Sequence, residues 1–454
     1  MSGYSNEQLQ EKFLAKKAKV LLHHPQGMGN YFTFHAASEI LGVDPNSLAI
    51  DGAYNVNAEG YYDMGYMSNH IGPPQSAIDA MKKATTRELL SIYPPDISGE
   101  LRELVAKKKF HRELGPDFDV MGVEGAQGGI GYTYLTFLDP GDEIIVTDPG
   151  YFHFAPSAES IGAVIKKIVL DESNEYRLKP DEVRSAITDR TKMIVVCDPV
   201  NPFGTVQTKE ELLEIAKIAR ENNILIFNNI THNTHQTDPE ATQIPMASLH
   251  STKDPMDHVI STSGTSKGYG MPAARVGFLA GHPALLRGAF LIKMETTKIH
   301  INYQGQFGAI AAMKDEEYLQ KSTEIIRRNY KHIEETVANT PGVKIPIRPK
   351  YGFCMMIDIS ETGVTAQEVT VGLLKRKIAV TPGDGLGDIG ATDYIRLNYS
   401  HPDIKCFETF REALPEAIKE AKTGIYKQGV IDFYKGVGSE RGNKIIKLLE
   451  SRKY

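Results

Sequence analysis

The middle of the chain alternates short apolar runs with longer amphipathic stretches. Four runs, at 142–149, 192–199, 223–229 and 257–264, are rich in β-branched residues and end at Pro, Asn or Gly, which predicts buried strands. Between the second and third, residues 208–222 form one apolar helical stripe, with Thr208 and Glu211 in capping-box positions. Such strand–helix–strand units predict an α/β fold with a mostly parallel sheet and ligand chemistry at the carboxyl ends of its strands.

A second pattern begins near residue 330 and predicts a smaller α+β domain. It contains a helix rich in Arg and Lys, strands around 352–359 and 393–400, and helices near 365–377 and 406–423. We therefore expect an N-terminal segment over 1–64 that lies partly in the small domain, a large domain over 65–330, and a small domain over 331–454. This last domain includes a C-terminal extension whose role the sequence does not indicate.

Composition restricts the classes of partner. The 51 basic and 57 acidic residues give a net charge of −6, so the chain has no overall positive field for nucleic acid or an anionic membrane. Cys197, Cys354 and Cys406 are far apart and fit neither a disulfide framework nor zinc spacing. No run reaches the roughly 18 apolar residues of a membrane span. We expect a cytoplasmic protein that binds small molecules, with no metal, nucleic acid or membrane partner.

One lysine stands in an unusual place. Lys267 lies among small residues in 263–278, directly after a predicted strand, although a lone lysine is most often only a solvated charge. Arg275 follows eight residues later, and two further loops, 123–129 and 198–205, also come after predicted strands. Taken singly, the first loop is compatible with a tight Gly-rich turn and the second with a simple Asn-Pro turn. Their order and spacing carry more information than any one of them.

Together these landmarks resemble the fold-type I aminotransferases of class I/II, the aspartate aminotransferase-like family, over roughly residues 90–400. The resemblance implies the fold-type I PLP-transferase architecture and pyridoxal 5′-phosphate (PLP) as cofactor. Lys267 would carry PLP as a Schiff base and later act as the base that moves the α-proton. The implied reaction transfers an α-amino group from an amino acid to a 2-oxo acid, in a homodimer with shared active sites.

The resemblance also assigns the phosphate end of the cofactor. Gly125, Ala126 and Gln127 would open a helix whose bare N–H groups and positive end face the 5′-phosphate. Arg275 would bind the phosphate with its fork of donors, a geometry that lysine does not offer. Tyr93 resembles the family tyrosine that reaches the phosphate of the neighbouring subunit.

Three further residues match family positions around the ring and the substrate. Tyr151 would stack on the pyridine ring, although without the family spacing either phenylalanine that follows it would fit as well. Asn201 would donate its amide to the 3′-oxygen. Arg396 would bind the substrate α-carboxylate. A surface charge on an edge strand is the alternative, but the apolar neighbours Ile395 and Leu397 indicate a buried strand.

The chain departs from the family at two positions. Asn229 stands where the family has an aspartate against the pyridine nitrogen, and His232 where it has a tyrosine, in a register supported by the step from Asn201. A neutral amide enforces neither protonation state of the nitrogen, so we expect a weaker electron sink unless a partner such as His232 compensates. The family's phosphate-binding serine is replaced by Gly264. Three neighbouring hydroxyls are candidates to replace it: Ser263, Thr265 and Ser266.

The missing aspartate keeps other outcomes open. The same fold supports PLP-dependent elimination, decarboxylation or oxidation, and a non-catalytic PLP-binding protein is a further alternative. A nicotinamide dehydrogenase is the alternative from another class, since residues 124–131 are rich in glycine. Their spacing is not that of the dinucleotide-binding GxGxxG motif, and no acidic residue closes a second strand at the expected distance.

Overall fold

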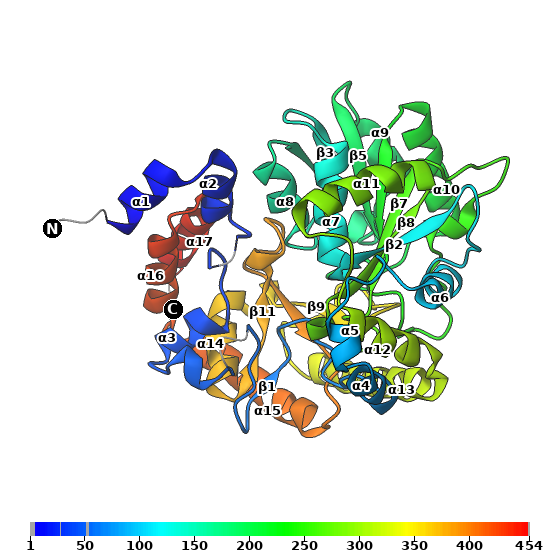
Figure 1. Ribbon diagram of the computed structural model, residues 1–454. Helices are drawn as coiled ribbons and strands as arrows, with labels where there is room; N and C mark the ends of the chain where they lie inside the picture. Colours follow the sequence, from blue (N-terminus) through cyan, green and yellow to red (C-terminus); the bar gives the residue numbers. More distant parts are fainter. Residues whose placement is uncertain (1–4, 28, 51–53, 453–454) are drawn as a thin grey trace.

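A computed structural model describes residues 5–27, 29–50 and 54–452 (Figure 1). Its centre is a seven-stranded sheet in which only β8 runs antiparallel to its neighbours. Across the sheet the strand order is β2 (Asp119–Glu124), β8 (Val276–Gly281), β7 (Val259–Gly264), β6 (Leu225–Asn229), β5 (Thr191–Cys197), β3 (Glu143–Asp148) and β4 (Val164–Val169). The predicted mostly parallel α/β sheet is confirmed.

Helices cover both faces of this sheet because successive strand side chains alternate between two apolar layers. One layer joins Ile144, Met193 and Phe227 to the first group of helices, and the other joins Ile145, Ile194 and Ile226 to the second. The first group contains α7 (Gly125–Phe137), α8 (Phe154–Ser160) and α11 (Pro283–Thr296). The second contains α9 (Pro180–Ala186) and α10 (Lys209–Glu221). Two further helices, α6 (Gly99–Lys109) and α12 (Tyr303–Lys314), pack on β2 and β8 in a cluster of their own. Helix α10 has the predicted capping box between Thr208 and Glu211.

A second hydrophobic core lies beside the large sheet. It joins side chains between Phe32 and Met67 to side chains between Ile326 and Leu449, so both ends of the chain pack together. Its strands are the antiparallel set β11 (Thr381–Pro382), β12 (Tyr394–Asn398) and β9 (Cys354–Asp358), and the parallel pair β1 (Tyr62–Asp63) and β10 (Ile378–Ala379). Its helices are α3 (Phe34–Ile40), α13 (Glu316–Ala338), α14 (Ala366–Lys375), α15 (Lys405–Ala421), α16 (Lys427–Val437) and α17 (Glu440–Ser451).

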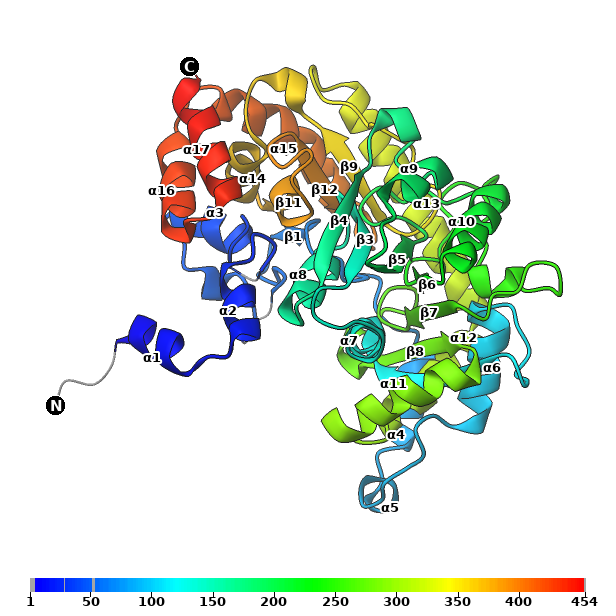
Figure 2. The same ribbon diagram turned by 90° about the horizontal axis from the view of Figure 1, so that it is seen from above.

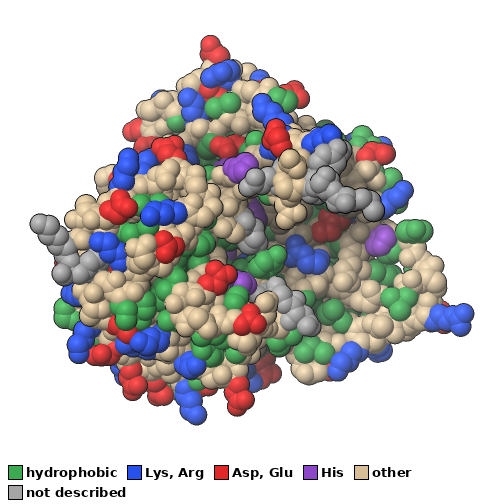
Figure 3. All heavy atoms as spheres, turned by 90° about the vertical axis from the view of Figure 1, so that its left-hand side faces the viewer, with side chains coloured by type: hydrophobic (Ala, Val, Ile, Leu, Met, Phe, Trp, Pro, Cys, Tyr) green, Lys and Arg blue, Asp and Glu red, His purple; other side chains and the backbone are tan. Residues whose placement is uncertain are grey.

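The remaining helices lie at the periphery. α4 (Gln75–Lys83) packs on α12, and the short α5 (Arg87–Leu90) projects from the large sheet (Figure 2). α2 (Lys16–His23) lies against α8, whereas α1 (Asn6–Phe13) extends away from the body in both ribbon views. Figure 3 shows the face that forms the left-hand side of Figure 1, and basic and acidic side chains are interspersed on it. Within the described ranges, no helix has both the length and the apolar character needed to cross a membrane.

Candidate active site

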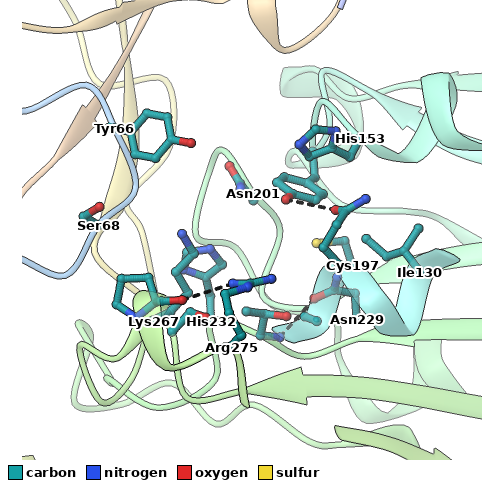
Figure 4. A pocket seen from close by; sticks show the side chains of 16 residues that line it. Tyr66, Ser68, Ile130, His153, Cys197, Asn201, Asn229, His232, Lys267 and Arg275 are labelled. Atoms are coloured by element: carbon teal, nitrogen blue, oxygen red, sulfur yellow. Dashed lines mark hydrogen bonds between the residues drawn. The ribbon is translucent and has the colours of Figure 1, made fainter. Parts of the chain in front are cut away.

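A cavity of about 280 Å³ lies where the carboxyl ends of β5, β6 and β7 meet the first turn of α7 (Figure 4). The parallel strands deliver their following loops to this one edge of the sheet. Nine residues predicted from the sequence line the cavity: Ala126, Gln127, Tyr151, Asn201, Asn229, His232, Ser266, Lys267 and Arg275. The structure therefore brings together loops that lie far apart in the chain.

Lys267 follows β7, and its amine reaches the segment that follows β1. Its Nζ donates to the backbone carbonyl of Met67 at 2.5 Å, and Asn69 Nδ2 donates to the carbonyl of Lys267 at 2.8 Å. Burial, together with the positive charges of Arg396 and Arg275, lowers the pKa of this amine to about 8. Such an amine exchanges its proton near neutral pH.

The first turn of α7 and Arg275 form one cationic end of the cavity. Gly125 has φ +68°, and a Cβ there would lie 2.5 Å from the Arg275 guanidinium, so a side chain would displace the arginine. Arg275 donates to the carbonyls of Glu124 at 2.7 Å and Pro272 at 3.1 Å. No side chain of the described residues caps the N-terminus of α7, which leaves its first N–H groups available to an anion.

Among the hydroxyls near Gly264, Ser266 alone lines this cavity in the described structure. Thr265 is buried and donates its hydroxyl to the carbonyl of Val276 at 3.2 Å. Ser263 is buried within β7, and its oxygen has no hydrogen-bond partner among the described residues. The geometry thus favours Ser266 over its two neighbours as the replacement for the family serine.

Polar side chains surround the middle of the cavity. The Tyr151 hydroxyl donates to Gln127 Oε1 at 3.3 Å, which fixes the tyrosine against the first turn of α7. Asn201 is buried, and its Oδ1 has no hydrogen-bond partner in the part of the chain that the structure describes. Buried polar atoms are usually paired, and Asn201 lines the cavity, so its side-chain amide is available to a ligand.

Asn229 ends β6, and its amide orientation is determined by the backbone. Asn229 Oδ1 accepts a hydrogen bond of 3.0 Å from the N–H of Thr231. Because a backbone N–H only donates, the facing atom must be the side-chain oxygen, which leaves Nδ2 as the donor. Burial lowers the pKa of His232 to about 3, with Lys267 and Arg396 acting in the same direction, so His232 is neutral at pH 7.

Arg396 lies in an adjoining cavity of about 260 Å³ that shares Tyr66 with the first. β12 places it there, 4% exposed, and one of its amino groups donates to the carbonyl of Gly65 at 3.1 Å. Its Nε and Nη1 have no partner among the described residues. A buried guanidinium with two free donors is costly unless an anion binds it.

Tyr93 lies outside both cavities. It is 85% exposed, near the projecting helix α5, and its ring lies 5.9 Å from that of His300. Sequence reasoning assigned no contacts to Tyr66 and Ser68, which line the first cavity, or to Tyr31, which lines the second. These residues belong to N-terminal segments that reach the site only because they pack into the second core. Figure 4 shows Tyr66 and Ser68 across the cavity from Asn229.

The comparisons with known proteins agree with this geometry. The family described as "Aminotransferase class I and II" matches residues 60–414. The aspartate aminotransferase of Pyrococcus abyssi is 28% identical over 76% of this chain and 88% of its own length. The aromatic-amino-acid aminotransferase 2 of Thermococcus litoralis is 28% identical over 80% and 93%. The solved aromatic aminotransferase of Pyrococcus horikoshii superposes with a TM-score of 0.72, at 26% identity, over 81% and 97%.

A lysine at the end of a parallel strand, a cationic helix start and a buried arginine together define a PLP-dependent enzyme of fold type I. The chain belongs to the class I and II aminotransferase family and is a PLP-dependent aminotransferase. The comparisons support amino-group transfer and give no support to elimination, decarboxylation, oxidation or a non-catalytic PLP-binding role.

The cavity residues fit PLP. The uncapped N-terminus of α7 and Arg275 suit a phosphate, and the Asn201 side-chain amide and the Lys267 amine line the same space. At Asn229 the chemistry differs from that of the family, which has an aspartate carboxylate at this position. Asn229 offers a donor in place of a negative charge.

Proposed function

We propose that this chain transfers the α-amino group of an amino acid with a large apolar side chain to a 2-oxo acid, with Lys267 as the residue that carries PLP. The observation that carries the substrate class is the composition of the cavity beside Arg396. Five aromatic side chains line it: Tyr31, Phe34, Tyr54, Tyr66 and Phe152. Val380 and Leu386 add aliphatic surface. Burying an apolar side chain against such a wall is favourable in proportion to its area.

The charges in this cavity disfavour an acidic side chain. Among its described lining residues, Arg396 is the only arginine or lysine, and we assign it to the α-carboxylate. Burial lowers the pKa of His35, so this imidazole is neutral at pH 7. Asp63, which also lines the cavity, would repel a second carboxylate whenever it is ionised. An aspartate or glutamate side chain therefore finds no free cation among these residues.

The roles of the chain's own residues follow from their positions. Bound PLP supplies an electrophilic carbonyl and a conjugated ring that accepts electrons from the substrate. Arg275 and the start of α7 would hold the phosphate, and Arg396 would fix the α-carboxylate through its two free donors. Lys267 would take up and release the substrate proton at its Nζ, for which a pKa near 8 is well matched.

We also propose that the functional unit is a cytoplasmic homodimer. The exposed Tyr93, Leu90 and Ile92 around the projecting α5 offer an apolar surface to a second copy, and this surface would carry Tyr93 toward that copy's phosphate site. The proposed reducing compartment suits the three cysteines, which are far apart in the chain and free in the structure. We keep the domain division 1–64, 65–330 and 331–454 as a proposal; the shared core of the first and last ranges supports placing the N-terminal segment in the small domain.

A donor panel tests the substrate class. Phenylalanine, leucine, alanine and aspartate are each supplied with 2-oxobutanoate, an acceptor without a second carboxylate, and the initial rates give kcat/KM for every donor. We expect phenylalanine to exceed aspartate by about a hundredfold, since an unmatched charge in an apolar pocket is strongly rejected. An enzyme that favours aspartate over phenylalanine would contradict the proposal.

A further inference from the structure

The two C-terminal helices lie beyond residues 60–414, the part that matches the family. They nevertheless belong to the second core, because Val430, Ile431, Tyr434, Ile445 and Leu449 are buried in it. The ribbon views place α16 and α17 together beside α3 (Figures 1 and 2). An addition that packs this closely is part of the folded unit, and its polar contacts show where it acts.

Those contacts converge on Asp384. The hydroxyl of Tyr434, on α16, donates to Asp384 Oδ2 at 2.6 Å, and the N–H of Phe32 donates to the same oxygen at 2.8 Å. Arg441, on α17, donates through Nη1 to the backbone carbonyl of Asp384. Arg441 is only 7% exposed. Both helices thus hold one short segment that follows β11.

The same segment is held from the opposite side by the large sheet. Arg441 Nε donates to Asp388 Oδ1 at 2.8 Å, while Lys167, on β4, donates to Asp388 Oδ2 at 2.6 Å. Burial alone would raise the pKa of Asp388, but Lys167 and Arg441 outweigh it and lower this pKa to about 2. The N–H of Asp388 also donates to Asp148 Oδ1 at 2.9 Å. The segment is therefore clamped between the two cores.

Gly385 and Leu386, between these anchor points, line the cavity that contains Arg396. The Leu386 carbonyl accepts from the N–H of Gly150 at 2.9 Å, next to Tyr151 of the first cavity. A Cβ on Gly385 would lie 2.8 Å from the ring of Tyr31, another lining residue. Any shift of this segment consequently moves the wall against which we place the substrate side chain.

We propose that Tyr434 and Arg441 are positioning residues for substrate specificity: through Asp384 and Asp388 they fix Gly385 and Leu386 as one wall of the side-chain pocket. This inference rests on the proposed function, which places a large apolar side chain in that cavity. Arg441 is suited to the task because its planar fork binds a carbonyl and a carboxylate at once. The C-terminal extension then sets how tightly large side chains are held, without contacting substrate or cofactor.

The test uses Arg441→Lys, Tyr434→Phe and the control Lys444→Met in the PLP-loaded enzyme. Arg441→Lys keeps the charge but loses the fork, and Tyr434→Phe keeps the ring but loses the donor. Lys444 lies on the same helix with its side chain 72% exposed, in an ion pair with Glu440. The probes are 3-phenylpropionate and propionate, two carboxylates that differ by a phenyl group and lack an amino group. Their inhibition constants are measured together with kcat and KM for phenylalanine and alanine.

For Arg441→Lys we expect KM for phenylalanine and the inhibition constant of 3-phenylpropionate to rise about tenfold, the scale of a changed hydrophobic pocket contact. Propionate inhibition and kcat for alanine should stay close to those of the unmodified enzyme. Tyr434→Phe should act in the same direction but less, and Lys444→Met should have no effect. A merely structural role would instead lower the melting temperature and affect both probes equally.

Two results would overturn the inference: an unchanged ratio of the two inhibition constants in Arg441→Lys and Tyr434→Phe, or an equal shift in Lys444→Met. The unmodified enzyme separates this failure from failure of the proposed function. If it binds 3-phenylpropionate no more tightly than propionate, the proposed substrate class is wrong, and the role of Arg441 in specificity falls with it. If it discriminates and the variants discriminate equally well, only the role of the extension is wrong.

Discussion

The side-chain oxygen of Asn229 accepts a hydrogen bond of 3.0 Å from the N–H of Thr231, so the side-chain nitrogen of Asn229 remains available as a donor to the cavity. An N–H donor pairs with an unprotonated ring nitrogen and brings no negative charge to favour a protonated one. His232 does not compensate, because its lowered pKa leaves it neutral. We therefore expect the pyridine nitrogen of bound PLP to be unprotonated at pH 7.

Asn229→Asp tests this expectation. The N–H of Thr231 should still bind one carboxylate oxygen, and the second oxygen should raise the pKa of the ring nitrogen. Nitrogen-15 NMR of labelled cofactor should show an unprotonated nitrogen in the unmodified enzyme and a protonated one in the variant. A protonated nitrogen in the unmodified enzyme would mean that another group has taken over the role of the family aspartate.

The lowered pKa of Lys267 predicts how the cofactor-free protein takes up PLP. Only the neutral amine is nucleophilic, so the rate of covalent capture should rise with pH through about 8, rather than through the usual range of lysine near 10.5. Arg396→Gln removes one cation that lowers this pKa and should move the profile to higher pH. Stopped-flow absorbance across pH 6–10 provides the measurement; identical profiles for both proteins would refute the electrostatic explanation.

Arg396→Lys should separate substrate binding from cofactor binding. The lysine keeps the charge but loses the two donors that Arg396 leaves free, so kcat/KM for phenylalanine should fall by about ten- to a hundredfold. The affinity for PLP should change little, because Arg396 lies in the adjoining cavity. Steady-state kinetics and a cofactor titration distinguish the two effects. A variant that loses PLP but keeps its KM would assign Arg396 to the cofactor.

Asp63 makes stability depend on pH. Burial raises its pKa to about 7, against hydrogen bonds from Tyr66 and Gly65 and the charge of Arg396, and His70 lies 3.9 Å away. The pKa of Asp63 is higher in the folded state than in the unfolded state. Protonated Asp63 therefore contributes its full stabilisation of the fold below about pH 4, and this contribution is lost as the pH rises toward 7. Asp63→Asn cannot ionise. Its free energy of unfolding, relative to that of the unmodified protein, should therefore increase by about 2 kcal/mol from pH 5 to pH 8. Urea unfolding of the cofactor-free forms measures this, with the exposed Asp432→Asn as control.

Much of the site was predictable because local patterns determine it. β-Branched runs ended by Pro, Asn or Gly marked β3, β5, β6 and β7, and parallel strands necessarily bring the loops at 123–129, 198–205 and 263–278 to one edge. Lys267 and Asn229 follow or end two such strands, and this position alone predicts that they share a site. The capping box of α10 likewise depends only on residues three apart.

The side-chain cavity was not predictable in this way. Tyr31 and Tyr66 lie about 300 residues or more before Leu386 in the chain, and they meet it only because both chain ends pack together. Arg441 shows the same limit: nothing in its sequence neighbourhood indicates that it binds Asp384 and Asp388. Tyr93 stays a prediction, since its proposed partner is a second copy of the chain.

Borohydride reduction of the PLP-loaded enzyme, followed by peptide mapping, tests the central claim most directly. We expect the reduced pyridoxyl group on the peptide that contains Lys267, and we expect Lys267→Ala to yield no labelled peptide while its circular dichroism is unchanged. Lys109 is a matched control, since it is also buried and the pKa of its amine is lowered to about 7, but it lies outside the cavity. Label on Lys109 or any lysine other than Lys267, or label that persists in Lys267→Ala, would contradict the assignment.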